Sequence, residues 1–118
     1  MIPVGVQVFV ALVPVDMRSG FERLAGLVCE SMGYEARSGA LFVFVGKRRT
    51  TLKILFFDGT GMCLFHKRLD RGTFALPEAA TEGITHLEID EGSFEALLDG
   101  IEISPQASTR TSVRRRLH

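Results

Sequence analysis

Residues 41–69 read LFVFVGKRRTTLKILFFDGTGMCLFHKRL, and this stretch contains three apolar runs separated by two polar turns. The runs are rich in Phe, Val, Ile and Leu, which suit a pleated and partly buried strand. The Asp58-Gly59 pair between the second and third runs is a strong hairpin signal. The stretch therefore predicts three consecutive antiparallel strands. The middle strand is apolar on both faces except at Lys53, so we expect both of its faces to be covered.

Two elements are predicted before this meander. Residues 4–12 carry aliphatic side chains at every second position, which is typical of a strand. Residues 21–32 place apolar side chains at i, i+3, i+4, i+7 and i+11, which predicts an amphipathic helix. Asp16 and Ser19 are alternative N-caps for this helix, and Gly33 is suited to end it in the left-handed conformation.

The chain after the meander predicts a weaker strand at Thr85–Ile89, followed by a short helix that Asp90 caps and Gly100 ends. Residues 104–118 are polar, rich in Ser and Thr, and basic, so we expect a flexible tail. The expected fold is α+β: a small antiparallel β-meander of three to five strands, packed by one longer and one short helix. Residues 1–103 would form this single domain.

The composition fits one domain with a substantial core, because the 118-residue chain is 46% hydrophobic and contains nine Phe. The net charge is zero, but the charge is unevenly distributed. Residues 1–75 hold ten basic and six acidic residues, residues 76–103 hold eight acids and no Lys or Arg, and residues 104–118 hold four Arg and no acid. Such asymmetry indicates a polyanion partner, or an acidic segment that covers the basic surface of the same chain, although an unevenly charged solvated surface has the same pattern.

The two cysteines and the apolar N-terminus bear on the cellular compartment. Cys29 and Cys63 belong to no close-spaced motif, so we expect reduced core thiols and a cytoplasmic protein. The first fifteen residues lack charge and alternate like a strand, which favours a strand over a signal peptide. No apolar run reaches membrane-spanning length, and we predict no membrane association.

No arrangement of residues predicts catalysis or metal binding. Asp16, Asp58 and Asp70 each lie beside a turn or a helix start, where Asp is favoured for local hydrogen bonds, and this interpretation outweighs a metal-binding triad. The histidines have no ligand spacing and no neighbouring cysteine. These are His66, His86 and His118. We therefore predict a protein that is not an enzyme and needs no cofactor.

Basic residues are the stronger candidates for a functional site. In a meander, the start of the central strand lies beside the end of the third strand, so the Lys47–Arg49 turn and the Lys67–Arg71 segment should converge. Such a cluster would neutralise phosphates of a nucleic acid, although Lys and Arg also commonly protect a sheet edge. The Arg114–Arg116 run is either a further phosphate contact or a solvated tail. The candidate nucleic-acid-binding residues are Lys47, Arg48, Arg49, Lys53, Lys67, Arg68 and Arg71.

Several segments together resemble a family of bacterial transposon proteins. The family pattern runs P-x-D-M-R-x-G-F-x-x-L, then S-G-x-L-F-V-F, K-I-L-x-x-D-G-x-G and K-R-L-x-x-G-x-F. This chain matches the first part at residues 14–24, the second at 38–44, and the last two between residues 53 and 74. The family is the small accessory protein TnpB, or Orf2, of insertion sequence 66 elements. The resemblance covers about two-thirds of the chain and is less clear in the acidic segment and the tail.

This resemblance implies a role in transposition beside a separate, larger transposase that carries the catalytic acids. Our leading hypothesis is a non-enzymatic accessory factor that binds DNA at the transposon ends, or the transpososome, through the basic end of the sheet. The alternative is a protein-interaction module that docks on the transposase, with the acidic residues 76–103 meeting a basic surface. An enzyme without a recognisable motif is a third and less favoured class.

Overall fold

The computed structural model of the chain describes residues 5–77 and 83–101. The predicted tail, residues 104–118, lies outside the described residues, and so does its Arg114–Arg116 run. The described parts form an α+β fold, as predicted.

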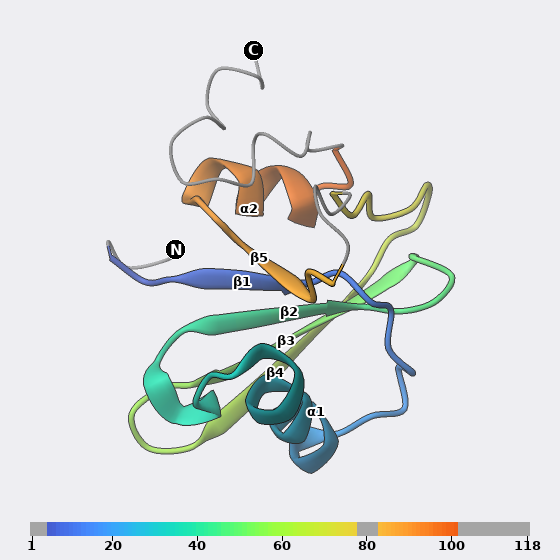
Figure 1. Ribbon diagram of the computed structural model, residues 1–118. Helices are drawn as coiled ribbons and strands as arrows, with labels where there is room; N and C mark the ends of the chain where they lie inside the picture. The colour runs from blue at the N-terminus through green and yellow to red at the C-terminus, as the bar shows by residue number, and fades with distance from the viewer. Residues whose placement is uncertain (1–4, 78–82, 102–118) are drawn as a thin grey trace.

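A five-stranded mixed sheet, with strand order β4-β3-β2-β1-β5, forms the centre of the molecule (Figure 1). The strands that were predicted in residues 41–69 are all present, and the weaker strand near residue 86 is present as well. The strands are β1 (Val8–Ala11), β2 (Leu41–Val45), β3 (Thr51–Phe57), β4 (Met62–Arg68) and β5 (His86–Ile89).

The predicted meander is confirmed in β2, β3 and β4, which pair antiparallel in sequence order. The β3–β4 turn depends on Asp58, whose Oδ1 accepts hydrogen bonds from the backbone N–H groups of Thr60 at 2.9 Å and Gly61 at 3.0 Å. These two bonds stabilise the carboxylate and lower the pKa of Asp58 to about 2. Asp58 is therefore a turn residue, as its position beside Gly59 predicts.

The first strand differs from the prediction of a purely antiparallel sheet. β1 pairs parallel with β2 and antiparallel with β5. A parallel pair needs a crossover connection, and the helix between β1 and β2 provides it. β1 is also buried on both faces, because Val8 and Val10 contact one core cluster whereas Phe9 and Ala11 contact another. The sheet is therefore mixed, with an antiparallel meander as one part.

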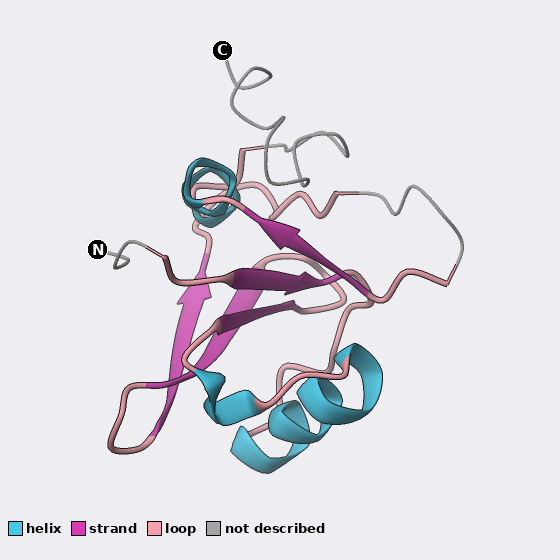
Figure 2. Cartoon of the chain, turned by 60° about the vertical axis from the view of Figure 1, so that its left-hand side comes forward, coloured by secondary structure: helices cyan, strands magenta, loops and turns pink. Residues whose placement is uncertain are grey.

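The two helices cover opposite faces of the sheet (Figure 2). α1 (Phe21–Leu27) continues through a π-helical turn at Val28–Met32 and ends at Gly33, whose φ of 79° is left-handed as predicted. α2 (Glu91–Leu98) begins after Asp90, whose carboxylate accepts a 2.9 Å hydrogen bond from the Ser93 N–H. The prediction that Asp90 caps the short helix is therefore confirmed.

Both predicted N-caps of the longer helix are wrong. α1 starts after Gly20, and no side chain caps it. The Asp16 carboxylate instead binds Arg18, and the backbone N–H of Ser19 donates to the Asp16 carbonyl. This loop is tied to the sheet at Val15, which holds Asp16 and Ser19 in a turn ahead of the helix.

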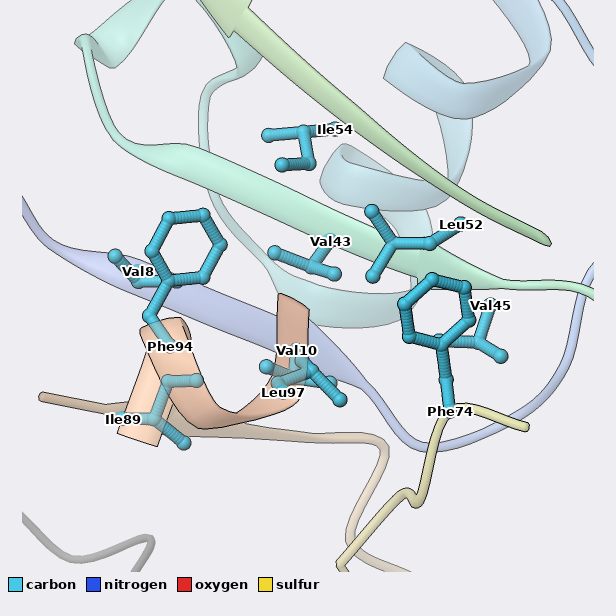
Figure 3. Packing of buried hydrophobic residues seen from close by; sticks show 10 residues of the cluster. All are labelled: Val8, Val10, Val43, Val45, Leu52, Ile54, Phe74, Ile89, Phe94 and Leu97. Atoms are coloured by element: carbon cyan, nitrogen blue, oxygen red, sulfur yellow. The ribbon is translucent and has the colours of Figure 1, made fainter. Parts of the chain in front are cut away.

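The sheet has a separate hydrophobic core on each face. The cluster under α2, called the α2-side core, is shown in Figure 3 and consists of Val8, Val10, Val43, Val45, Leu52, Ile54, Phe74, Ile89, Phe94 and Leu97. The cluster under α1, called the α1-side core, consists of Phe9, Ala11, Leu24, Val28, Met32, Ala40, Phe42, Phe44 and Leu55. The predicted covering of both faces of the central strand is confirmed.

The cysteines differ in part from the expectation of core thiols. Both are free, but Cys29 is exposed and Cys63 is half-buried. Cys29 follows Val28 in the π-helical turn, and this one-residue step takes it from the buried stripe to the solvent-facing side.

Candidate nucleic-acid interface

The two basic segments predicted to converge lie side by side at one end of the sheet. Thr51 pairs with Arg68 at the β3–β4 end. Beyond that pair, the Leu69 N–H donates to the Thr50 carbonyl at 2.9 Å, and the Phe74 N–H donates to the Arg49 carbonyl at 2.6 Å. The β2–β3 turn and the segment after β4 are therefore connected by backbone hydrogen bonds.

A third segment, the loop that leads to α1, joins them at the same end. Val15 forms a parallel bridge with Gly46, and its N–H donates to the Val45 carbonyl at 3.0 Å. Gly46 allows this close approach, because a Cβ atom there would lie only 2.7 Å from Cγ of Met17. The sequence between β1 and α1 thus reaches the basic turn.

These three segments enclose a groove of about 440 Å³, called the basic groove below. Three of the predicted site residues line it, and the loop before α1 contributes one further cation. Its walls consist of Val15, Asp16, Met17, Arg18, Gly46, Lys47, Arg48, Thr50, Thr51 and Arg68.

The charge of the groove is strongly positive. Four cations face one carboxylate, that of Asp16, which binds Arg18 with an Nη2–Oδ2 distance of 2.7 Å. The hydrogen bonds and charge of Arg18 hold the pKa of Asp16 well below its usual range, so this acid stays ionised. Lys47, Arg48 and Arg68 are exposed, and none has a salt bridge within the described residues.

Two other predicted residues flank the groove without forming its walls. Arg49 and Arg71 are exposed in the turns next to it. The backbone of Arg49 has a φ of 61°, a left-handed conformation that is uncommon for a residue with a side chain. The hydrogen bond between its carbonyl and Phe74 maintains this conformation.

Lys53, also predicted as a site residue, is 9% exposed. Its Nζ donates a 2.9 Å hydrogen bond to the Ser19 carbonyl, and it lies on the α1 side of the sheet. The structure therefore gives Lys53 a clear structural contact, which fixes the loop before α1 to the central strand.

Lys67 has a comparable contact on the other face. Its side chain is half-buried, and Nζ donates a 2.7 Å hydrogen bond to the carbonyl of Leu98 in the last turn of α2. A cation there satisfies a helix-end carbonyl and interacts favourably with the helix dipole. Lys67 thus connects β4 to α2.

We expect the substitution Lys53→Ala to lower the free energy of unfolding by about 1.5–3 kcal/mol, because it removes a charge-assisted hydrogen bond to the carbonyl of the half-buried Ser19. Urea denaturation followed by circular dichroism measures this change. The salt dependence of DNA binding by the folded protein should stay that of the wild type. A variant with unchanged stability but weaker DNA binding would instead place Lys53 at the ligand.

Arg18 is the groove residue that reasoning from charge did not select. It is isolated in the sequence, far from the basic turns, and only the Val15–Gly46 bridge brings it to them. A signal was present, however, because Arg18 belongs to the D-M-R part of the family pattern.

Within the described ranges, no group of three or more His, Cys, Asp or Glu side chains is positioned to hold a metal ion. His66 is exposed on the edge strand, whereas His86 lies 3.2 Å from the Tyr34 hydroxyl through Nε2. His118 lies outside the described residues. Among the helices that the structure describes, none is sufficiently long and apolar to cross a membrane.

Comparison with known proteins agrees with the motif pattern. The family model described as IS66 Orf2 like protein matches residues 6–108, which include the whole acidic segment. The chain belongs to the IS66 Orf2-like family. Two similar relatives are uncharacterized proteins of Sinorhizobium fredii. The protein y4hO is 42% identical over 104 residues, covering 86% of this chain and 88% of the relative. The protein y4jC is 35% identical over 98 residues, covering 83% of this chain and 81% of the relative.

No solved structure matches the chain. The IS66 Orf2-like family is associated with transposition in an accessory role. Its D-M-R motif lies in the basic groove through Asp16 and Arg18, and its D-G motif forms the β3–β4 turn at Asp58 and Gly59. In this member of the family, one motif therefore shapes the groove and another builds the sheet.

Proposed function

We propose that this IS66 Orf2-like protein is a non-catalytic accessory factor that binds DNA through the basic groove. The observation that carries the proposal is the convergence of Arg18, Lys47, Arg48 and Arg68 around a single carboxylate that Arg18 already neutralises. Exposed cations without acidic partners attract a polyanion, and the release of counterions from DNA makes this binding favourable.

The groove has the chemistry of a phosphate site. Arginine side chains donate paired hydrogen bonds to phosphate oxygens, and Lys47 adds a point charge. The hydroxyl-bearing residues Thr50 and Thr51 line the same walls. None of these contacts depends on the identity of a base, so the groove would position DNA without selecting its sequence. The flanking Arg49 and Arg71 would extend the charged surface along the strand.

The test is the salt dependence of DNA affinity. Each neutralised phosphate contributes about −0.9 to the slope of log affinity against log salt on duplex DNA. The double substitution Arg48→Ala/Arg68→Ala should therefore flatten the slope by about two units and weaken binding on the order of 50-fold at 0.1 M salt. The loss should be similar for the ends of the element and for random DNA. Fluorescence anisotropy over a salt series measures both quantities.

Arg37 offers a matched control for the lost charge. It is exposed, but it lies at the opposite end of β3, where its guanidinium carbon is 5.8 Å from the centroid of the Phe57 ring. The single substitution Arg37→Ala changes net charge as much as Arg48→Ala does, and it should leave the slope unchanged. If Arg37→Ala and Arg48→Ala flattened the slope equally relative to the wild type, net charge and not the groove would govern binding.

The second candidate function, docking on the transposase, is favoured by the outer side of α2. Glu91, Glu95 and Asp99 are exposed and follow each other at intervals of four residues, so they form one acidic stripe. The helix α2 itself lies on the face of the sheet opposite α1 (Figure 2). A protein that shows no DNA affinity at low salt, yet co-purifies with the transposase until these acids are neutralised, would support docking in place of DNA binding.

A further inference from the structure

A second cavity adjoins the basic groove, and its location suits a ligand. It lies beyond the carboxyl ends of the parallel strands β1 and β2, the position where open sheets with parallel strands commonly bind ligands. Its volume is about 480 Å³, within the range of small-molecule sites. Ala11, Leu27, Met32 and Phe44 form apolar walls between the sheet and α1.

The rim of this cavity is polar and cationic on balance, because its one carboxylate, that of Asp16, is already bound by Arg18. Arg23 on α1 and Lys47 after β2 both line it, and neither forms a salt bridge within the described parts of the chain. Ser19 also lines it; its hydroxyl makes no hydrogen bond to another described residue, whereas its carbonyl accepts one from Lys53. Such a cavity suits a ligand with an apolar, hydrogen-bonding body and an anionic group beside it.

The cavity and the basic groove lie next to each other. They share Val15, Asp16 and Lys47 as walls, so the shared Lys47 stands between the two. A phosphate chain in the groove would therefore pass the mouth of the cavity. Bases in a duplex are stacked and paired, so an unpaired base enters such a space at a lower free-energy cost than a base that must first be flipped out of a duplex.

We propose that this cavity binds one unpaired base of single-stranded DNA, while the adjacent phosphates lie on Lys47 and the basic groove. This inference rests on the proposed function, because the groove must hold the strand. The cationic rim favours a nucleotide over an apolar peptide side chain, which would gain nothing from Arg23 and Lys47. Arg23 would contact the next phosphate along the strand, on the α1 side of the cavity.

The test uses three DNA ligands: a blunt duplex, the same duplex with a short single-stranded overhang, and that overhang built from abasic residues. The abasic ligand keeps every phosphate and lacks only the bases. We expect the wild type to bind the overhang with bases roughly tenfold more tightly than the abasic overhang, because a base in the cavity buries apolar surface. A fluorescent 2-aminopurine in the overhang should also change its emission on binding.

Two variants fill the cavity. Val13 lines the cavity and is 63% exposed, so Val13→Trp should fold normally. Leu27 lines the cavity from α1, and Leu27→Trp would fill the space from that side. Both should abolish the preference for the overhang with bases and leave the affinity for the blunt duplex unchanged. Ile101→Trp adds the same side chain at an exposed position outside the cavity and should keep the preference. Circular dichroism verifies the fold of each variant.

The possible failures are distinguishable. Equal binding of the two overhangs, with blunt-duplex binding still lost in the Arg48→Ala/Arg68→Ala variant, would overturn the base site and leave the proposed function intact. Absence of binding to all three ligands at low salt would overturn both the base site and the proposed DNA-binding function. A preference that survives Val13→Trp would also refute this cavity as the base site. Loss of a transposase complex in Val13→Trp, with the DNA preference intact, would assign the cavity to a peptide.

Discussion

The substitution Phe74→Ala is expected to lower the free energy of unfolding by about 3–5 kcal/mol. Phe74 is 0% exposed and belongs to the α2-side core, although it lies in the irregular segment after β4. Figure 3 shows its ring reaching towards Val45. Removing the ring leaves a cavity at the basic end of the sheet, and domains of this size are stable by only about 5–15 kcal/mol.

Urea denaturation at constant salt measures this effect, and the slope of the unfolding free energy with urea should stay unchanged. Phe65 offers the matched control, because it is 46% exposed on the edge strand β4. Phe65→Ala should cost far less than Phe74→Ala. Similar costs for both substitutions would mean that the segment after β4 does not pack on the sheet, and the assembly of the basic end would then be wrong.

The second large effect is expected on the opposite face. Leu24 is fully buried in the α1-side core, and Leu24→Ala should lower the free energy of unfolding by about 2–5 kcal/mol. It should reduce transposition in cells through protein abundance, since less of the chain is folded. Leu24→Met keeps most of the volume and should cost less than about 1.5 kcal/mol.

Thermal unfolding of the Leu24 variants, together with their abundance in cells, tests this prediction. The affinity of the folded fraction for DNA should match the wild type, because Leu24 does not line the basic groove. A Leu24→Ala protein as stable as the wild type would refute the packing of α1 on the sheet. A Leu24→Ala protein that is as stable as the wild type but binds DNA more weakly would instead indicate that α1 contacts the DNA.

The sequence by itself determined the local elements and their immediate neighbours. The Asp58-Gly59 turn and the flanking apolar runs predicted the β2-β3-β4 meander, because hairpin register depends on residues close in the chain. The same meander predicted that the Lys47–Arg49 turn meets the end of β4. Cap residues Gly33 and Asp90 were also readable, since each satisfies backbone groups only a few residues away.

The tertiary structure alone decided the place of β1 and the composition of the basic groove. No local signal shows that β1 pairs parallel with β2, because that pairing depends on the packing of α1 across the sheet. This pairing brings Val15 to Gly46 and thereby Arg18 to Lys47. Lys53 and Lys67 resembled surface cations in the sequence, but distant carbonyls hold their ammonium groups. A charge pattern records which residues are cationic, whereas long-range contacts decide which of them remain free to meet a ligand.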